Sequence, residues 1–507
     1  MENDSKLPLA GCSTASPIVT PPEELRPNPM VKYYQLQTVD VPRQGPKKKP
    51  TESLPTYFIM LQTEEWHTRY KKNRQQMHAV GALAPILVSG AASIAWSVGL
   101  QTPDIDQGPT FTPDWFIAAI IGAIISMFWA NRVPTRRVAQ LATGLIITAG
   151  FLFICSEKEM KYIRAALYID GLANGLVFAP MIALIGELTV FYMRGFVAAF
   201  IEQFCPCIGI CAQVIYPYLW KSTSLEHLEH DGLHGAIGVL SGIFAMSLST
   251  FFSKESPVKL LIRGKPLYAM EVLRRVQAPN TLTEELFEQQ AENKSYVMES
   301  RQLSTYRSIT QALPALLRLC CLRALHAMSL AIFIVLFRTN YGDINHLVWS
   351  YPILGIFRIF GNLITMPIME LIGHRITTLI GLLLYGSMAF IMTSFARNCT
   401  YGMVLVSLLQ TFSALAFTAS PAFLSEAYPM AIKEQFIALT YIVEMSVYIF
   451  VYSYFTDTKS CTNYLYLMSI FTLLFCLLAV WILPETKRTT LREALEKFKG
   501  FVSKRIH

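Results

Sequence analysis

The chain is 507 residues long; only 15% of its residues are Asp, Glu, Lys or Arg, whereas 53% are apolar or aromatic residues or Cys. A soluble globular protein carries roughly 25% charged residues, and a disordered protein has low hydrophobicity, so both classes are excluded. The net charge of +8 comes from 43 basic and 35 acidic residues. Because the basic residues lie between apolar runs, they indicate orientation in a membrane rather than nucleic-acid binding.

The first part of the chain, residues 1–74, is predicted to be a disordered cytoplasmic tail. Its opening, MENDSKLPLAGCSTASPIVTPPEE, is rich in Pro and Ser and contains no apolar segment of the kind found in signal peptides. Segments of this composition cannot bury enough apolar surface to offset the entropy lost on ordering. We therefore expect neither a signal peptide nor a packed structure here.

Twelve apolar segments follow, each with the length needed to cross about 30 Å of hydrocarbon as a helix of roughly 20 residues. Six lie at residues 77–99, 114–130, 137–155, 164–186, 195–219 and 233–252. Six more lie at residues 311–337, 346–369, 376–396, 401–424, 435–455 and 462–483. The predicted fold is an all-α membrane protein in which 12 transmembrane helices form two six-helix, pseudo-symmetric halves, at residues 75–252 and 311–483.

A polar linker at residues 253–310 separates the halves, and its amphipathic stretches LYAMEVLRRV and EELFEQQAENK predict short surface helices. Basic residues gather in alternate loops, for example Arg132–Arg137 and Lys254–Arg275, which places these loops and the linker in the cytoplasm. The loop after the first span carries Asp104, Asp106 and Asp114 without Lys or Arg. Both termini, including the C-terminal segment 484–507, are therefore expected in the cytoplasm.

No pattern of metal or cofactor binding stands out. The ten cysteines form no CxxC pair, and His227, His230 and His234 of HLEHDGLH are expected in a solvated external connection rather than in a metal site. The sequon Asn398-Cys399-Thr400 lies close to the membrane, and its glycosylation stays open. We expect no metal, no cofactor, no nucleic-acid partner and no enzymatic activity.

Short motifs recur in the two halves. NRVPTRR at 131–137 follows the second span and ELIGHR at 370–375 follows the eighth; Glu187 precedes Arg194, and Glu426 precedes Lys433. A carboxylate at one helix end and a cation at the next can hold two helices together until gating separates them. The residues expected to form this latch are Asn131, Arg132, Arg136, Glu187, Arg194, Glu255, Glu370, Arg375, Glu426, Lys433 and Glu485.

These motifs resemble those of the major facilitator superfamily, and most closely those of its sugar porters, over roughly residues 75–500. NRVPTRR and ELIGHR are similar to the DRxGRR loops, GELTVFYMRG to the E-to-RG signature, and ESPVKLLIRGKPLYAMEVLRRV to the PESPRWLL segment with its following helix. SEAYPMAIKEQ resembles the ExxPxxxR motif, and PETKRTTLREALEKF resembles the terminal PETKGxxLE motif. The resemblance implies alternating access, in which two halves rock about a midplane cavity.

The chain also departs from the family pattern. Asn131 replaces an Asp and Pro134 a Gly, so the first latch is expected to be weaker; Lys254, Val258 and Lys259 replace the Pro, Arg and Trp of PESPRW. The seventh-span QQLSG stretch and the Gly-Pro and Trp of the tenth span, which contact a hexose in the family, are absent. The resemblance therefore implies the fold and the class and leaves the solute open.

A sugar must exchange its hydrogen bonds to water for bonds to protein, which favours amides near an aromatic ring. Gln203 and Gln213 in the fifth span resemble in position the amides of the family's sugar-contacting helix. Asn174, Asn362 and Trp96 are further candidates. For each amide the alternative is a hydrogen bond that only joins two helices.

Ionisable residues within a membrane are costly and mark functional sites or ion pairs. Asp170, Glu202, Arg323, Arg358 and Glu444 lie within the predicted spans. We favour structural pairing for them, such as Asp170 with Arg164. The first span contains no carboxylate, whereas proton-coupled sugar porters place an Asp there; this favours passive uniport, with Glu202 or Asp170 as the alternative proton site.

The sequence thus predicts a transporter of a small polar solute, a sugar or polyol, in the plasma membrane, with a monomer expected to suffice. One alternative is an organic-ion carrier of the same superfamily, although the short loop after the first span argues against it. The other alternative is a solute sensor that does not transport.

Overall fold

The computed structural model describes Thr68 and residues 70–99, 111–157, 159–221, 230–278, 280–340, 350–395, 399–455 and 458–500. All of these belong to a single unit, Glu64–His507. Asp104, Asp106, His227 and Asn398 lie outside the described residues, as do most of the predicted tail and residues 501–507. The predictions made for them therefore stay predictions.

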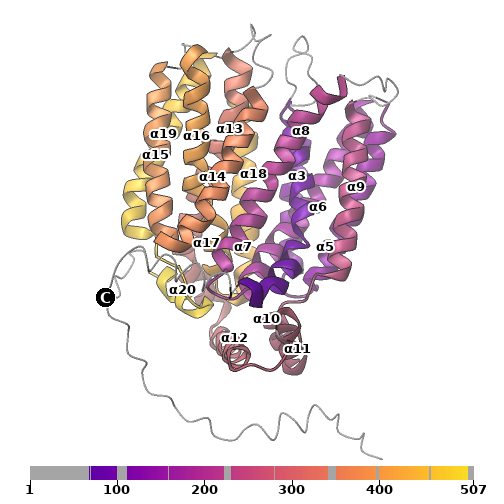
Figure 1. The fold of residues 1–507 in the computed structure, drawn as a ribbon, viewed down its shortest axis with the longest axis vertical. Coiled ribbons are helices and arrows are strands. Elements are labelled where there is room, and N and C mark those ends of the chain that lie inside the picture. Colours follow the sequence, from indigo (N-terminus) through magenta and orange to yellow (C-terminus); the bar gives the residue numbers. More distant parts are fainter. Residues whose placement is uncertain are drawn as a thin grey trace, which may run out of the picture. The chain divides into compact units, whose positions relative to one another are not determined.

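The described part of the N-terminal half consists of helices (Figure 1). It begins with a helix over Tyr70–Gly81. Its further elements are α3 (Ala84–Ser97), α4 (Asp114–Trp129), α5 (Thr135–Ile154), α6 (Met160–Leu188), α7 (Arg194–Ala199), the π-helix η2 (Phe200–Phe204), α8 (Cys205–Lys221) and α9 (His230–Phe251).

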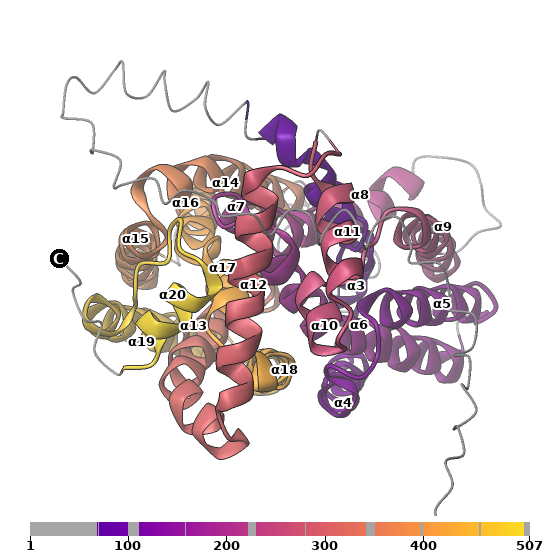
Figure 2. The same ribbon diagram turned by 90° about the horizontal axis from the view of Figure 1, so that it is seen from below.

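Three linker helices lead to the C-terminal half, and in Figures 1 and 2 they lie at the lower end of the bundles. The linker helices are α10 (Pro257–Ile262), α11 (Pro266–Val276) and α12 (Glu284–Gln302). The C-terminal half contains α13 (Thr305–Asn340), α14 (Ser350–Ile372), α15 (His374–Phe395), α16 (Cys399–Phe417), α17 (Ser420–Glu426), the 3₁₀ turn η3 (Met430–Ile432), α18 (Lys433–Tyr454), α19 (Thr458–Ile482) and α20 (Leu491–Phe498).

The helices in the described part of the chain confirm the predicted all-α membrane fold. Ten helices are long and apolar enough to cross a membrane, the bent pair Tyr70–Gly81 and Ala84–Ser97 adds one more, and the shorter α4 is also apolar. Large apolar side chains such as Phe128, Leu240 and Leu477 are more than 60% exposed. Since such residues are stable on a surface only against hydrocarbon, the protein is a multi-pass membrane protein.

Proline and a π-turn break three spans that the apolar pattern predicts as continuous. The first span bends by 47° before α3, where Pro85 lacks the N–H of a regular helix. The tenth span is interrupted between α16 and α17, just before Pro421. In the fifth span, η2 adds a π-turn that contains Glu202. The π-turn is the break that matters for the site, because Glu202 lines the cavity described below.

The linker differs from its prediction in two ways. It contains one helix of 19 residues, α12, whereas only short helices were expected. The helix α13 begins at Thr305, inside the segment predicted as linker, because no Pro or Gly interrupts the helix between Thr305 and Thr310. The domain boundaries at residues 74, 252, 310 and 483 stay a prediction.

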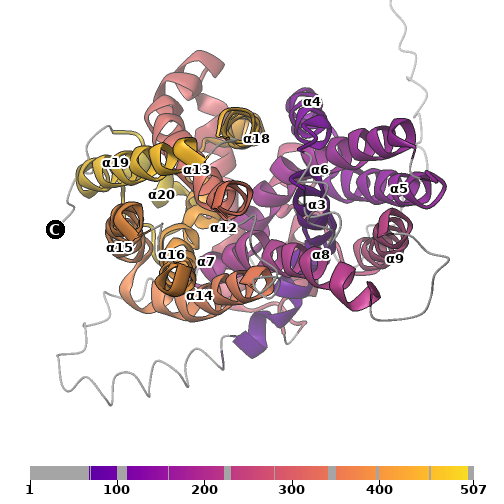
Figure 3. The same ribbon diagram turned by 90° about the horizontal axis from the view of Figure 1, so that it is seen from above.

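Within each half, helices pack closely through small residues, and Figure 3 shows the two groups of helices end-on. A Cβ atom on Gly171 would lie 2.2 Å from the carbonyl oxygen of Trp115, and one on Gly175 would lie 2.1 Å from that of Ala119. These glycines therefore let α6 approach the backbone of α4. In lipid, where the hydrophobic effect does not join helices, such close packing is a main source of stability.

We expect Gly175→Ala to lower the free energy of unfolding by about 1–3 kcal/mol, because the backbone of α4 cannot move away without disturbing its helix. Gly81→Ala is the matched control, since a Cβ atom there would have nothing within 4 Å, and its effect should be neutral or slightly stabilising. Thermal unfolding of both variants in detergent measures the difference. Equal melting temperatures for the two variants would contradict the close approach of α4 and α6.

Candidate functional site: a central cavity and a latch

A cavity of about 120 Å³ lies between the two halves. Helices α3, α4, α6 and α8 line it from the N-terminal half, and α13, α14, α16 and α18 from the C-terminal half. One water molecule needs roughly 10–15 Å³ of such space, so the cavity has room for a small solute. Its charged side chains are Glu202, Arg323, Arg358 and Glu444, and its further polar side chains include Asn174, His326, Gln410, Tyr441 and Tyr448.

The centre of the cavity wall is a buried ion network around Arg323. Its guanidinium lies 2.6 Å from Oε1 of Glu202, which comes from the N-terminal half. It also donates through Nε to Oε2 of Glu444 over 2.9 Å, and Oε1 of Glu444 lies 2.8 Å from Nδ1 of His326. All four side chains are at least 94% buried. The network joins the halves directly, because η2 places Glu202 opposite α13.

Arg358 on α14 forms the second polar part of the wall. Its Nη1 donates to Oε1 of Gln410 over 3.1 Å and to Oγ of Ser413 over 2.9 Å. Ser413 in turn donates to Ser329 over 3.0 Å. These contacts join α14, α16 and α13 but contain no carboxylate.

Aromatic side chains of α18 pack against α6, α4 and the residues just before α4, beside the cavity. Phe111 lies 5.1 Å from Tyr452, and Phe116 lies 5.4 Å from Tyr448, measured between ring centroids. Phe178 stacks on Tyr441 at 4.2 Å and contacts Arg323 through its ring face. Rings at these distances attract each other weakly beyond their burial, so they can separate and reform.

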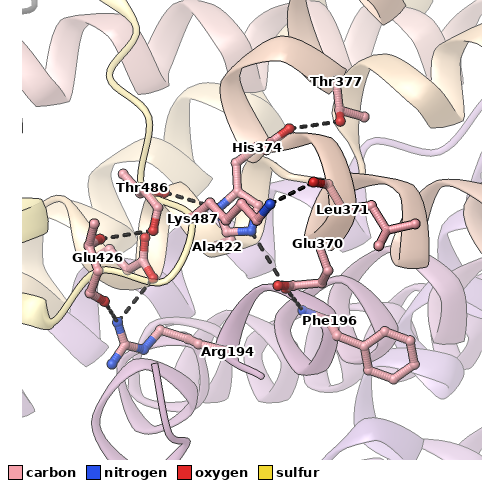
Figure 4. A network of polar contacts seen from close by, with 12 residues as sticks. Arg194, Phe196, Glu370, Leu371, His374, Thr377, Ala422, Glu426, Thr486 and Lys487 are labelled. Carbon is pink, nitrogen blue, oxygen red and sulfur yellow. Dashed lines mark hydrogen bonds and ion pairs between the residues drawn. The ribbon is translucent and has the colours of Figure 1, made fainter. Parts of the chain in front are cut away.

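The linker end is closed by ion pairs that cross from one half to the other. Nη1 of Arg194 lies 3.0 Å from Oε1 of Glu426, and Nζ of Lys433 lies 3.5 Å from Oε1 of Glu187 (Figure 4 shows the first pair). Ser256, which caps α10, donates to the other oxygen of Glu187. Four of the predicted latch residues thus form two buried cross-half pairs.

A third buried ion pair joins Lys259 of the linker to Glu434 of α18. Lys259 also donates to Thr135 over 3.1 Å, and Glu434 accepts from the backbone N–H of Asn131 over 3.0 Å. Asn131 adopts a left-handed backbone with φ of 61°, which Asn tolerates better than most residues. The cation that anchors the linker is therefore at Lys259, where the family has Trp.

In the second half, the loop after α14 is held by carboxylates that accept backbone N–H groups. Glu370 accepts from Phe196 of the other half over 3.0 Å, as Figure 4 shows, and Glu485 accepts from His374 and Arg375 over 3.0 and 3.1 Å. Gly373 has φ of +125°, and a Cβ atom there would lie 2.4 Å from Oε2 of Glu485. A turn that only Gly adopts easily thus brings two N–H groups onto one carboxylate.

The remaining predicted latch residues make contacts within one half or to the linker. Arg136 donates to the carbonyl of Thr250 over 2.6 Å, and the carbonyl of Arg132 accepts from Arg263 over 3.2 Å. Arg375 donates to the carbonyl of Val480. Glu255 lies 3.9 Å from Arg263, and burial raises the pKa of its carboxyl despite the neighbouring cations.

Of the five predicted solute contacts, Asn174 lines the central cavity. Gln203 donates to Glu202 over 2.6 Å, and Asn362 donates to the carbonyl of Gln203 over 3.3 Å. Gln213 accepts from Tyr216 over 2.8 Å and lies 2.7 Å from Nδ1 of His234; Trp96 donates to Asp231 over 3.2 Å. These four side chains are buried beside the cavity rather than among the residues that line it.

Two expectations about polar residues are wrong. Arg164 binds Asp114 through two hydrogen bonds of 3.0 and 3.1 Å, and Asp170 instead accepts from Trp115 over 2.7 Å, because Asp114 begins α4 next to Arg164. His230 and His234 belong to α9 rather than to a solvated loop, and His234 is 95% buried. No group of His, Cys, Asp or Glu among the described residues has the arrangement of a metal site.

Several site residues were missed by the sequence analysis. His326 follows Arg323 by three residues on one helix face, which would have indicated a shared environment. Gln410, Tyr441 and Tyr448 gave no such signal, since polar and aromatic residues are frequent in spanning helices. Glu434 follows Lys433 directly, and the two side chains take part in different ion pairs.

The fold is shared with solved transporters of low sequence identity. The chain is similar to a major facilitator superfamily proton:xylose symporter, XylE, bound to 6-bromo-6-deoxy-D-glucose, with a TM-score of 0.68, 18% identity, and coverage of 83% of this chain and 98% of that one. The inward-open xylose transporter XylE from E. coli gives a TM-score of 0.57, 16% identity, and coverage of 83% and 98%. The human organic anion transporter TETRAN gives a TM-score of 0.57 and 12% identity, with coverage of 80% of this chain and 99% of that one.

A search of curated protein sequences gives no significant match. The sequence profile described as "Sugar (and other) transporter" matches residues 102–498. This match spans more than half of the chain, including both halves and the linker, and agrees with the resemblance read from the motifs. The chain belongs to the sugar (and other) transporter family.

Proposed function

We propose that the protein carries a small polar solute, a sugar or polyol, across a membrane by alternating access. The observation that carries the proposal is a central cavity, whose mostly apolar wall carries several charged and amide side chains, between two halves joined at the linker end by buried ion pairs. A solute in the cavity would gain access to the linker side only when these pairs break. The aromatic contacts of Phe111 and Phe116 would close the other end.

The finer parts of the proposal rest on the sequence. The lack of a carboxylate in the first span supports passive uniport, and the pairing of Glu202 and Glu444 with Arg323 supports a structural role for both. The alternating basic loops support cytoplasmic termini. We propose the plasma membrane as the location, and a monomer as the working unit.

Uptake of radiolabelled hexoses and polyols into proteoliposomes tests the proposal. We expect saturable uptake that does not change when a proton gradient is imposed. Stimulation by an acidic outside medium would contradict uniport, and the absence of uptake for every hexose and polyol would contradict the proposed solute class.

We further expect Asn174→Ala to raise KM about fivefold, since one hydrogen bond contributes about 1 kcal/mol. Gln213→Ala is the matched amide variant. Its amide contacts Tyr216 and His234, so its effect should fall mainly on thermal stability. A larger KM change for Gln213→Ala would place the solute at Gln213 in the fifth span instead.

A further inference from the structure

The guanidinium of Arg358 has unpaired hydrogen-bond donors at the cavity wall. Its side chain is 96% buried and lines the cavity. Nη1 is occupied by Gln410 and Ser413, whereas Nε and Nη2 have no hydrogen-bond partner among the residues that the structure describes. The thiol of Cys207 interacts with the guanidinium, but a neutral thiol is a weak acceptor.

The two carboxylates of the cavity bind residues other than Arg358. Glu202 and Glu444 both bind Arg323, and their remaining oxygens contact Gln203 and His326. Glu444 feels the charge of Arg358, yet the described residues place no carboxylate within 4 Å of Arg358. Leaving two N–H groups of a buried guanidinium without acceptors is costly, so their presence at a cavity indicates a ligand that accepts hydrogen bonds from both.

The geometry of the two unpartnered groups indicates the chemistry of that ligand. Nε–H and Nη2–H lie along one edge of the planar guanidinium and point in parallel, which matches the two oxygens of a carboxylate. Beside them, Nε2 of Gln410 also lacks a partner and belongs to the same wall. It can donate to a hydroxyl next to the carboxylate.

We propose that the cavity binds an anionic solute, a sugar acid, whose carboxylate forms a bidentate pair with Arg358. The proposal rests on the proposed transport function and narrows its substrate class. The hydroxyl groups of the solute would bind Gln410 and Asn174. The network of Arg323 would remain intact and separate the solute from Glu202 and Glu444.

Matched pairs of solutes test this inference, with the full chain reconstituted in proteoliposomes. The pairs are D-glucuronate with D-glucose, D-galacturonate with D-galactose, and D-gluconate with sorbitol. In each pair the two members differ only in whether one end is a carboxylate. We expect at least one acid to have a KM or a Kd at least tenfold lower than that of its neutral counterpart.

The variants assign this preference to one side chain. Arg358→Gln should raise the KM for the acid about ten- to a hundredfold and leave that for the neutral solute within about twofold. Arg358→Lys keeps the positive charge but loses the planar pair of N–H groups, so it should retain part of the preference for the acid. Arg307→Gln, which removes an exposed arginine near the start of α13, is the control.

Thermal unfolding without solute separates recognition from a structural role. Because Arg358 forms no ion pair with a described carboxylate, Arg358→Gln should leave the melting temperature unchanged or higher. A preference for neutral solutes that Arg358→Gln does not alter would overturn the inference and leave the transport function standing. If neither member of any pair is bound or carried, the proposed function itself fails, and the inference with it.

Discussion

Arg323→Met should lower the free energy of unfolding by about 3–5 kcal/mol, the typical effect of removing one partner from a buried ion pair. The substitution keeps an unbranched side chain of similar length but leaves Glu202 and Glu444 without their shared cation. Both carboxylates are at least 94% buried, so neither can be hydrated without opening the bundle. Thermal unfolding in detergent, followed by tryptophan fluorescence, measures the loss.

The control for this prediction removes all three charges together. Arg323→Met combined with Glu202→Gln and Glu444→Gln leaves no buried charge in the network, and similar replacements elsewhere are often neutral in stability. We expect this triple variant to melt closer to the unaltered protein than Arg323→Met alone does. If the single variant is as stable as the triple one, the carboxylates are not held by Arg323.

The sequence predicts the helices and the latch well because both depend on local patterns. Spans are recognised from runs of apolar residues. Glu187, Arg194, Glu426 and Lys433 lie at helix ends within short motifs, and equivalent motifs in both halves meet where the halves meet. Their pairing as Arg194 with Glu426, and Glu187 with Lys433, follows from that symmetry.

The cavity wall could not be predicted in the same way, because it depends on contacts between residues far apart in the chain. Arg323 and Glu444 are 121 positions apart, and nothing local indicates that they pair. The π-turn η2 inserts an extra residue into one turn and changes the face that Glu202 presents, so a helix of regular period misplaces it. Gln203 and Gln213 were predicted as solute contacts from their resemblance in position to the family's sugar-contacting helix; in the structure their side chains contact Glu202 and His234, and their role toward a solute stays a prediction.

Arg194→Gln should open the linker end of the protein. Arg194 and Glu426 are 96% and 98% buried, and without the guanidinium the carboxylate of Glu426 is stable only when water reaches it. Separation of the halves supplies that water. If the pair contributes about 2–3 kcal/mol to closure, the population open at the linker end rises roughly 30- to 150-fold.

A cysteine at position 425 measures this opening. Ser425 is fully buried, and its carbonyl oxygen lies 2.4 Å from the Cβ position of Gly186 in the other half. The side chain of Ser425→Cys should therefore react with a maleimide only when the halves separate. Labelling at this site, followed by peptide mass spectrometry, distinguishes it from the native cysteines.

Two comparisons make the latch result specific to the ion pair. Arg274→Gln removes an arginine whose ion pair lies within α11, to Glu271, and should not change the labelling of Ser425→Cys. The double variant Arg194→Glu with Glu426→Arg restores opposite charges across the interface, so it should slow the labelling of Ser425→Cys again. If the double variant labels as fast as Arg194→Gln does, closure depends on the shape of these side chains and not on their charges.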